Sequence, residues 1–166
     1  MPSKTLPPKP RSIAAKKTIS IVASLYNEDL VNSLLDSTVH GLRTLIPGIT
    51  VNIYRVPGAF EIPVCVKKLI ESNNVDVMIA LGVIIKGETS HAELVGSSVT
   101  QSLQEIATNF NTPIIHEVLL TENRDQAIER CGGDKNRGKE AAKAAATMSE
   151  LFSSLDAANK RNPNLS

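Results

Sequence analysis

Short apolar runs alternate with longer amphipathic stretches along most of the chain. The short runs are rich in β-branched residues and predict strands, whereas apolar residues three or four positions apart predict helices. The predicted strands span residues 19–24, 49–54, 76–81 and 113–120. The predicted helices span residues 30–42, 64–70, 89–110, 122–130 and 138–155. Because strands that alternate with such helices run parallel, with helices on both faces, we predict a three-layer α/β/α sandwich around a four-stranded, mainly parallel sheet.

The length of 166 residues, 42% of them hydrophobic, fits a single folded core. Charge is uneven: the first 17 residues hold five Lys or Arg, four Pro and no acid, so the remainder has a formal charge of −4. We predict a flexible basic tail over residues 1–17, a body over residues 18–156 and a C-terminal tail over residues 157–166. The N-terminal tail fits a nucleic-acid arm, a transit remnant or a solvated leader. The tail has only one Arg and lacks the continuous apolar core of a secretory signal, which favours the solvated leader. We therefore expect no nucleic-acid partner.

Several classes of protein are disfavoured by the composition. No run approaches the roughly 20 apolar residues that span a bilayer, so no membrane partner is expected. Cys65 and Cys131 are far apart and lack CxxC spacing, which argues against a disulfide or zinc site and favours a reducing, cytoplasmic location. The three His residues do not cluster, so no metal is predicted.

Unusual residues follow the first three predicted strands, where parallel sheets bind their ligands. Tyr26 and Asn27 follow the first strand. The aromatic ring of Tyr26 fits either a platform that stacks on a ligand or a side chain that packs at the rim. Residues 57–61, Pro-Gly-Ala-Phe-Glu, follow the second strand. Glu61 there fits a ligand contact or a favourable place in the first turn of a helix, near the positive end of its dipole. Each feature alone is weak evidence for a site.

The segment "GVIIKGETSH" carries the strongest local signal. Gly82 and Gly87 have the spacing of a P-loop, but Glu88 stands where that loop needs Lys, which disfavours nucleoside triphosphates. The free N–H groups of residues 87–89 at the start of a helix still predict a site for a single phosphate. His91, a few residues further on, fits a catalytic role or a surface role. His40 and His116 are weaker candidates.

A second charged region spans residues 121–145. Arg130 ends a predicted helix, where a cation either complements the helix dipole or binds an anion. Arg137 and Glu140 fit a solvent-exposed ion pair.

Five segments in order, "VASLYN", "VPGAFEIP", "GVIIKGETSH", "TENRDQAIERCG" and "NRGKEAA", make residues 19–155 similar to the lumazine synthase family of riboflavin biosynthesis. The resemblance implies a flavodoxin-like fold and the condensation of 5-amino-6-(D-ribitylamino)uracil with 3,4-dihydroxy-2-butanone 4-phosphate. The products are 6,7-dimethyl-8-ribityllumazine, phosphate and water, and no cofactor or metal is needed. It also implies a homopentamer with sites between subunits, a hollow 60-mer in many members, and riboflavin synthase as a candidate partner.

The resemblance also assigns roles to residues. Tyr26 is expected to stack on the pyrimidine and Glu61 to accept the ribityl hydroxyls. The full set for the pyrimidine and ribityl chain is Tyr26, Asn27, Ala59, Phe60, Glu61, Val83, Ile84, Ile85 and His116. The set for the phosphate is Gly87, Glu88, Thr89 and Arg130. His91 is the expected proton-transfer residue, with Arg137 and Glu140 in a supporting role.

Two features depart from the family pattern. In the family, the fourth strand commonly has the sequence Pro-x-x-Phe-Gly. This chain has His116 and Glu117 at the last two positions of that motif. Arg137 replaces the usual Lys. The alternative is a non-catalytic relative that binds lumazine or flavin, or one that only forms a shell. Neither alternative needs Arg130 and His91, and both residues are present. The sequence therefore favours the enzyme.

Overall fold

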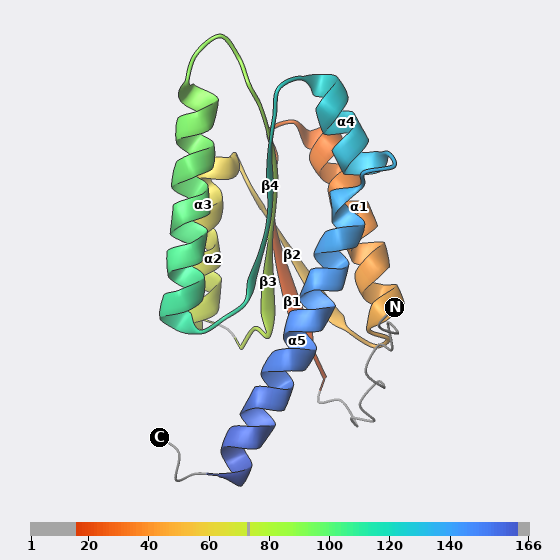
Figure 1. The fold of residues 1–166 in the computed structure, drawn as a ribbon, viewed down its shortest axis with the longest axis vertical. Coiled ribbons are helices and arrows are strands. Elements are labelled where there is room, and N and C mark those ends of the chain that lie inside the picture. Colours follow the sequence, from red (N-terminus) through yellow and green to blue (C-terminus); the bar gives the residue numbers. More distant parts are fainter. Residues whose placement is uncertain (1–15, 73, 163–166) are drawn as a thin grey trace, which may run out of the picture.

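A four-stranded parallel sheet forms the centre of the protein. The computed structural model describes residues 16–72 and 74–162, and all structural statements below concern these residues. The strands are β1 (Thr18–Ser24), β2 (Thr50–Val56), β3 (Val77–Ile85) and β4 (Ile114–Thr121), in the spatial order β2-β1-β3-β4 (Figure 1). All three strand pairs are parallel. The order reverses between β1 and β3, and doubly wound sheets bind ligands at such a switch point.

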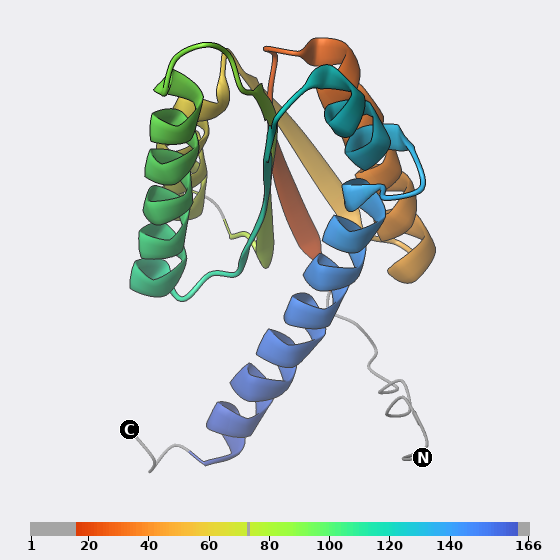
Figure 2. The same cartoon turned by 45° about the horizontal axis from the view of Figure 1, so that its top comes forward.

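Helices cover both faces of this sheet, which confirms the predicted three-layer sandwich. The 3-10 helix η1 (Ala59–Glu61) leads into α2 (Ile62–Ser72), and α2 lies beside α3 (His91–Phe110) on one face. The other face carries α1 (Glu28–Leu45), α4 (Arg124–Gly132) and α5 (Arg137–Arg161). Figure 2 shows the two groups of helices separated by the sheet. The order of the strands is that of flavodoxin-like folds.

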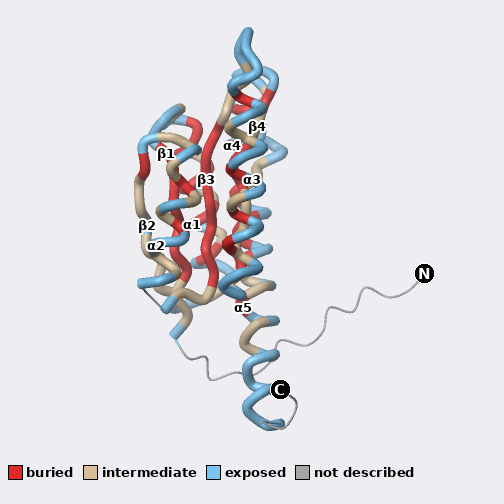
Figure 3. The backbone as a smooth tube through the Cα atoms, turned by 90° about the vertical axis from the view of Figure 1, so that its left-hand side faces the viewer, coloured by how far each residue is buried: buried red, intermediate tan, exposed pale blue. Residues whose placement is uncertain are grey.

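The core has two halves because strand side chains alternate between the faces of the sheet. Ile19, Ile21 and Ala23 of β1 pack on the side of α1 and α5, whereas Val22 packs on the side of α2 and α3. The central strand β3 is buried on both faces, as its red tube in Figure 3 shows. Burial on both faces explains why β3 reads as a continuous apolar run instead of an alternating one.

Two predicted boundaries differ from the structure. The third strand, predicted to end at residue 81, continues to Ile85 because Gly82 keeps its place in the ladder opposite Val118. A Cβ at residue 82 would come within 3.2 Å of Ser24 Oγ and 3.3 Å of Val118 Cγ1, so this glycine marks tight packing and not a break. The last helix, predicted to end at residue 155, continues to Arg161.

The predicted tails fall partly outside the described residues. Residues 1–15 and 163–166 are not described, but Lys17 of the predicted N-terminal tail lies against the body. Its Nζ hydrogen-bonds to Ser153 of α5 and is 3.9 Å from Asp76. Residues 157–161 of the predicted C-terminal tail are helical and exposed, and α5 projects past the sheet (Figure 1). None of the helices in the described part of the chain has the apolar length needed to cross a bilayer.

Candidate active site

A pocket of about 440 Å³ lies where β1, β2 and β3 end, next to the start of α3. It gathers residues from all three segments that the sequence singled out. The predicted residues that line it are Tyr26, Ala59, Phe60, Glu61, Val83, Ile84, Ile85, Gly87, Thr89 and His91. Gly58, Ala92 and Val95 also line it and were not predicted. Ala92 and Val95 follow His91 on one face of α3, so helical periodicity is the signal from which they could have been predicted.

Tyr26 stands at the rim of the pocket with 74% of its surface exposed. Its backbone N–H donates to Pro57 O at 3.0 Å, which ties the β1–α1 turn to the β2–α2 turn. The next residue, Asn27, has left-handed backbone angles and donates from Nδ2 to Val83 O at 2.8 Å. Asn27 is not among the residues that line the pocket.

The turn after β2 presents a carboxylate and an aromatic ring to the same pocket. Glu61 Oε2 accepts a hydrogen bond from Gly58 N at 2.9 Å, and Glu61 N donates to Gly58 O at 3.3 Å. A Cβ on Gly58 would come within 3.1 Å of Glu61 Oε2, so a glycine here lets the carboxylate fold back onto the turn. One oxygen of Glu61 is thus fixed, and its Oε1 makes no hydrogen bond within residues 16–72 and 74–162. Phe60 is 63% exposed beside it.

The turn between β3 and α3 has the features of an anion site. No backbone N–H from Gly87 to Ser90 donates to an acceptor in the described chain. The 20-residue helix α3 starts at His91, whose N–H lies 3.5 Å from Thr89 Oγ1. Free N–H groups and the positive end of a helix dipole both attract a negative charge. Gly87, Thr89 and His91 line the pocket, whereas Glu88 is exposed outside it.

Lys86, which the sequence did not single out as a site residue, precedes this turn but is neutralised locally. Its Nζ contacts the carboxylates of Glu122 and Glu93. The hydrogen bond that Lys86 donates to Glu122 is the main cause that raises the pKa of Lys86. Its backbone N–H donates to Thr121 O at 2.9 Å, so Lys86 holds the end of β3 to the end of β4. The positive field at residues 87–90 therefore comes from the helix and not from a free lysine.

The other predicted site residues do not meet the pocket within one chain. Arg130 is exposed on α4, on the opposite face of the sheet from α3 (Figures 1 and 2). Its guanidinium makes no hydrogen bond or ion pair to any other described residue. His116, Arg137 and Glu140 are also absent from the pocket lining. Within one chain, these four predicted residues therefore lie apart from the pocket.

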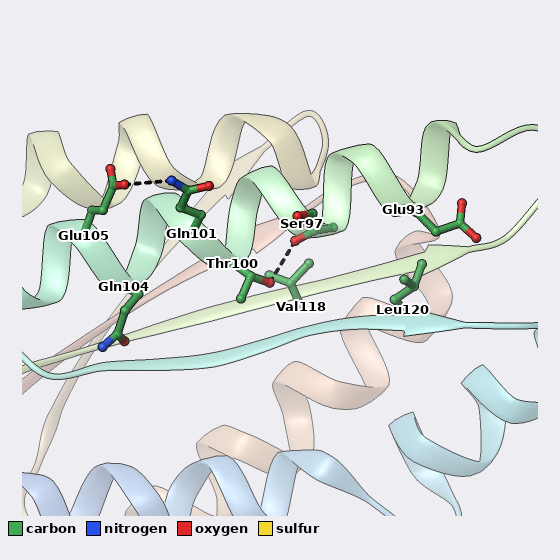
Figure 4. A pocket seen from close by; sticks show the side chains of 9 residues that line it. Glu93, Ser97, Thr100, Gln101, Gln104, Glu105, Val118 and Leu120 are labelled. Atoms are coloured by element: carbon green, nitrogen blue, oxygen red, sulfur yellow. Dashed lines mark hydrogen bonds between the residues drawn. The ribbon is translucent and has the colours of Figure 1, made fainter.

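His116 contacts Thr100 of α3. Thr100 lines a groove of about 660 Å³ between α3 and β4 (Figure 4). His116 Nδ1 accepts a hydrogen bond from Val118 N at 3.0 Å, so Nε2 carries the proton and donates to Thr100 Oγ1 at 2.7 Å. Thr100 Oγ1 in turn donates to Gly96 O at 2.8 Å. Burial lowers the pKa of His116. His116 is thus held as a neutral imidazole, and both ring nitrogens are used by the protein.

Glu117, the second departure from the family motif, is paired with the first residue of α5. Its side chain is only 7% exposed, and Arg137 donates to both of its oxygens, from Nε to Oε2 and from Nη2 to Oε1, each at 3.1 Å. Arg137 Nη1 also contacts Glu140. Burial is the main cause that raises the pKa of Glu117, against the guanidinium, which lowers it. Arg137 and Glu140 are therefore not an isolated exposed pair, because Arg137 neutralises a buried carboxylate.

Replacing Arg137 by alanine is expected to lower the free energy of unfolding at pH 7 by about 2–3 kcal/mol, because a buried carboxylate loses its partner. A carboxyl whose pKa is raised on folding stabilises most below its usual 4.5 and less as the pH rises. The variant raises that pKa further, so its loss should be smaller at pH 5 than at pH 7. Urea unfolding at both pH values measures this difference. Glu140→Ala, which removes only the exposed partner, is the control; equal losses at both pH values for Arg137→Ala would contradict the prediction.

The described residues contain no group of three His, Cys, Asp or Glu side chains placed to hold a metal ion. Cys131 is buried in the core, which raises its pKa to about 11, and Cys65 on α2 is half-buried. Neither thiol lines the pocket.

The strand order and the pocket at its switch point are those of doubly wound α/β proteins, a class that binds small molecules at the carboxyl ends of its strands. The family model for 6,7-dimethyl-8-ribityllumazine synthase matches residues 16–153. A 6,7-dimethyl-8-ribityllumazine synthase of Burkholderia mallei (strain SAVP1) is 45% identical over 139 residues, which cover 83% of this chain and 79% of that protein. The same enzyme of Burkholderia multivorans is 43% identical over the same shares. The chain belongs to the 6,7-dimethyl-8-ribityllumazine synthase family.

Proposed function

We propose that the chain condenses 5-amino-6-(D-ribitylamino)uracil with 3,4-dihydroxy-2-butanone 4-phosphate in the pocket at the ends of β1, β2 and β3. The products are 6,7-dimethyl-8-ribityllumazine, phosphate and water, in the penultimate step of riboflavin biosynthesis. The observation that carries this proposal is the convergence in one pocket of an exposed aromatic ring, a fixed carboxylate, a turn of free N–H groups and an imidazole. Family membership supplies the identity of the two substrates.

The pocket residues divide between the two substrates. Tyr26 stacks on the pyrimidine, whose edges meet the backbone of residues 83–85. Glu61 accepts hydrogen bonds from the ribityl hydroxyls through the oxygen that Gly58 does not use. The phosphate lies on the free N–H groups of residues 87–90, where the start of α3 attracts negative charge.

His91 moves protons during imine formation, loss of phosphate and ring closure. It is exposed at the first turn of α3 and lines the pocket next to Thr89, so it reaches the space between the phosphate and the pyrimidine. An imidazole both accepts and donates protons near neutral pH. Because both reactants are intrinsically reactive, holding them together supplies more of the rate than His91 does.

A second copy of the chain completes the site with Arg130. Departing phosphate needs a charge-assisted partner besides N–H groups, and Arg130 is exposed without a partner in its own described chain. Large apolar side chains surround the pocket at the surface, and Ile128 is exposed on the helix of Arg130. The exposed apolar residues near the pocket are Tyr26, Phe60, Val64 and Leu94. Exposed apolar groups of this kind mark contact surfaces.

A contact between two different surfaces repeats head to tail and closes into a ring when the rotation fits. We propose a ring of five copies, as family resemblance implies, with the pocket of each copy facing α4 of the next. Free thiols at Cys65 and Cys131 suit a reducing compartment, so we place this enzyme in the cytoplasm.

The direct test is the absorbance and fluorescence of the lumazine when purified protein meets both substrates, corrected for the uncatalysed reaction. We expect a rate that is proportional to protein concentration and saturates with each substrate. A protein that binds the lumazine but does not speed its formation would be a non-catalytic relative, and this result would contradict the proposal.

A further inference from the structure

We infer that Asn27 is a positioning residue, which fixes the ring of Tyr26 without lining the pocket. The inference rests on the proposed function, because it takes Tyr26 as the residue that stacks on the pyrimidine. It changes the role expected of Asn27 from the resemblance, which placed this residue among those that bind the substrate.

The backbone of Asn27 is unusual for its place in the fold. It is the residue before α1, where the backbone is normally extended and an Asn side chain accepts an N–H of the first turn. Here φ is 56° and ψ is 46°, and the side chain makes no such bond. The only other described non-glycine residue with positive φ is Asn111, at 48°, and it follows the last turn of α3, where this conformation is common. Asn27 thus gives up a helix cap and adopts a strained backbone.

The hydrogen bond from Asn27 Nδ2 to Val83 O, at 2.8 Å, gives a reason for this conformation. It ties the β1–α1 turn to the end of β3, and the bond from Tyr26 N to Pro57 O ties the same turn to the end of β2. Tyr26 is therefore held from both sides through its backbone. Tyr26 is 74% exposed in the single chain, so within one chain these two bonds fix the backbone that carries its ring.

An amide is the group that meets both requirements. Asn tolerates the left-handed region better than most residues, and its Nδ2 donates to a carbonyl, whereas an aspartate at residue 27 has no hydrogen to donate. Glycine keeps the backbone conformation and removes only the side chain.

Asn27→Gly is therefore the informative variant. We expect it to raise the KM for the pyrimidine substrate about three- to tenfold, the effect of one lost hydrogen bond, with the KM for the butanone phosphate unchanged. Asn27→Asp should raise the pyrimidine KM at least as much. Asn111→Gly is the matched control, because it makes the same change at the other left-handed Asn, and it should leave both constants unchanged. A pyrimidine KM that is unchanged in Asn27→Gly would overturn the inference.

A double-mutant cycle with Tyr26→Ala separates positioning from direct contact. If Asn27 acts through the ring of Tyr26, Asn27→Gly should change the pyrimidine KM less than twofold once the ring is gone. If the two effects multiply, Asn27 contacts the substrate by itself and the inference is wrong. The parent protein distinguishes this failure from that of the proposed function: a parent that makes no lumazine refutes the function, whereas a parent that turns over with multiplying effects refutes only the role of Asn27.

Discussion

Replacing Arg130 by alanine is expected to raise the KM for 3,4-dihydroxy-2-butanone 4-phosphate by about ten- to a hundredfold. A charge-assisted hydrogen bond to a phosphate contributes about 1.5–3 kcal/mol, and each 1.4 kcal/mol is a factor of ten. The KM for the pyrimidine should change little, because the phosphate lies at the other end of the site. Initial rates measured against each substrate in turn give both constants.

The control for Arg130 is Arg124→Ala on the same helix. Arg124, the first residue of α4, is also exposed, but its guanidinium pairs with Asp29 of α1. We expect Arg124→Ala to leave both Michaelis constants unchanged. Arg130→Lys should recover only part of the loss, because an ammonium cannot make the planar two-pronged contact of a guanidinium. If Arg130→Ala raised the KM of both substrates equally, Arg130 would instead have a structural role at the end of α4.

Replacing His91 by alanine is expected to lower kcat by about tenfold to a hundredfold, with both Michaelis constants nearly unchanged. Acid–base catalysis commonly contributes about 10²–10⁴-fold, and we expect the low end or less because positioning survives the substitution. A loss confined to kcat and kcat/KM marks an interaction made in the transition state. His40→Ala on α1, also exposed, is the control and should behave like the parent.

The pH profile gives a second test of His91. If His91 moves protons in the chemical step, the pH profile of kcat should change shape in His91→Ala and stay that of the parent in His40→Ala. If His91→Ala has the rate and the profile of the parent, His91 is a bystander, and proximity together with phosphate binding carries the catalysis.

The order of elements could be predicted from the sequence because each helix and strand has its own periodicity. Residues 19–24 read as a buried strand and β1 spans Thr18–Ser24, with a difference of one residue. The boundary at Gly82 was missed because glycine usually weakens a strand, and only its three neighbours in space explain why it is tolerated. The extension of α5 to Arg161 was missed because these residues are exposed and have no apolar pattern.

The pocket could be predicted because the carboxyl ends of parallel strands meet at one edge of the sheet. What the sequence lacked was the side of the sheet on which each helix packs, so it could not show that Arg130 and His91 lie on different faces. It also lacked the partners of polar side chains. In the sequence, Glu117 was visible only as a departure from a family motif. Its hydrogen bonds to Arg137 depend on the packing of the start of α5 against β4, which the sequence does not show.

The central claim is that the pocket of one copy and Arg130 of a second copy form one active site. Oligomers formed from equal amounts of two variants test this claim through their rate of lumazine formation. One variant is Arg130→Ala, and the other combines Tyr26→Ala with His91→Ala. With random mixing in a ring, about a quarter of the sites combine an intact pocket with an intact Arg130, so we predict about a quarter of the parent rate. A mixture no faster than the mean of the two separate variants would contradict the shared site.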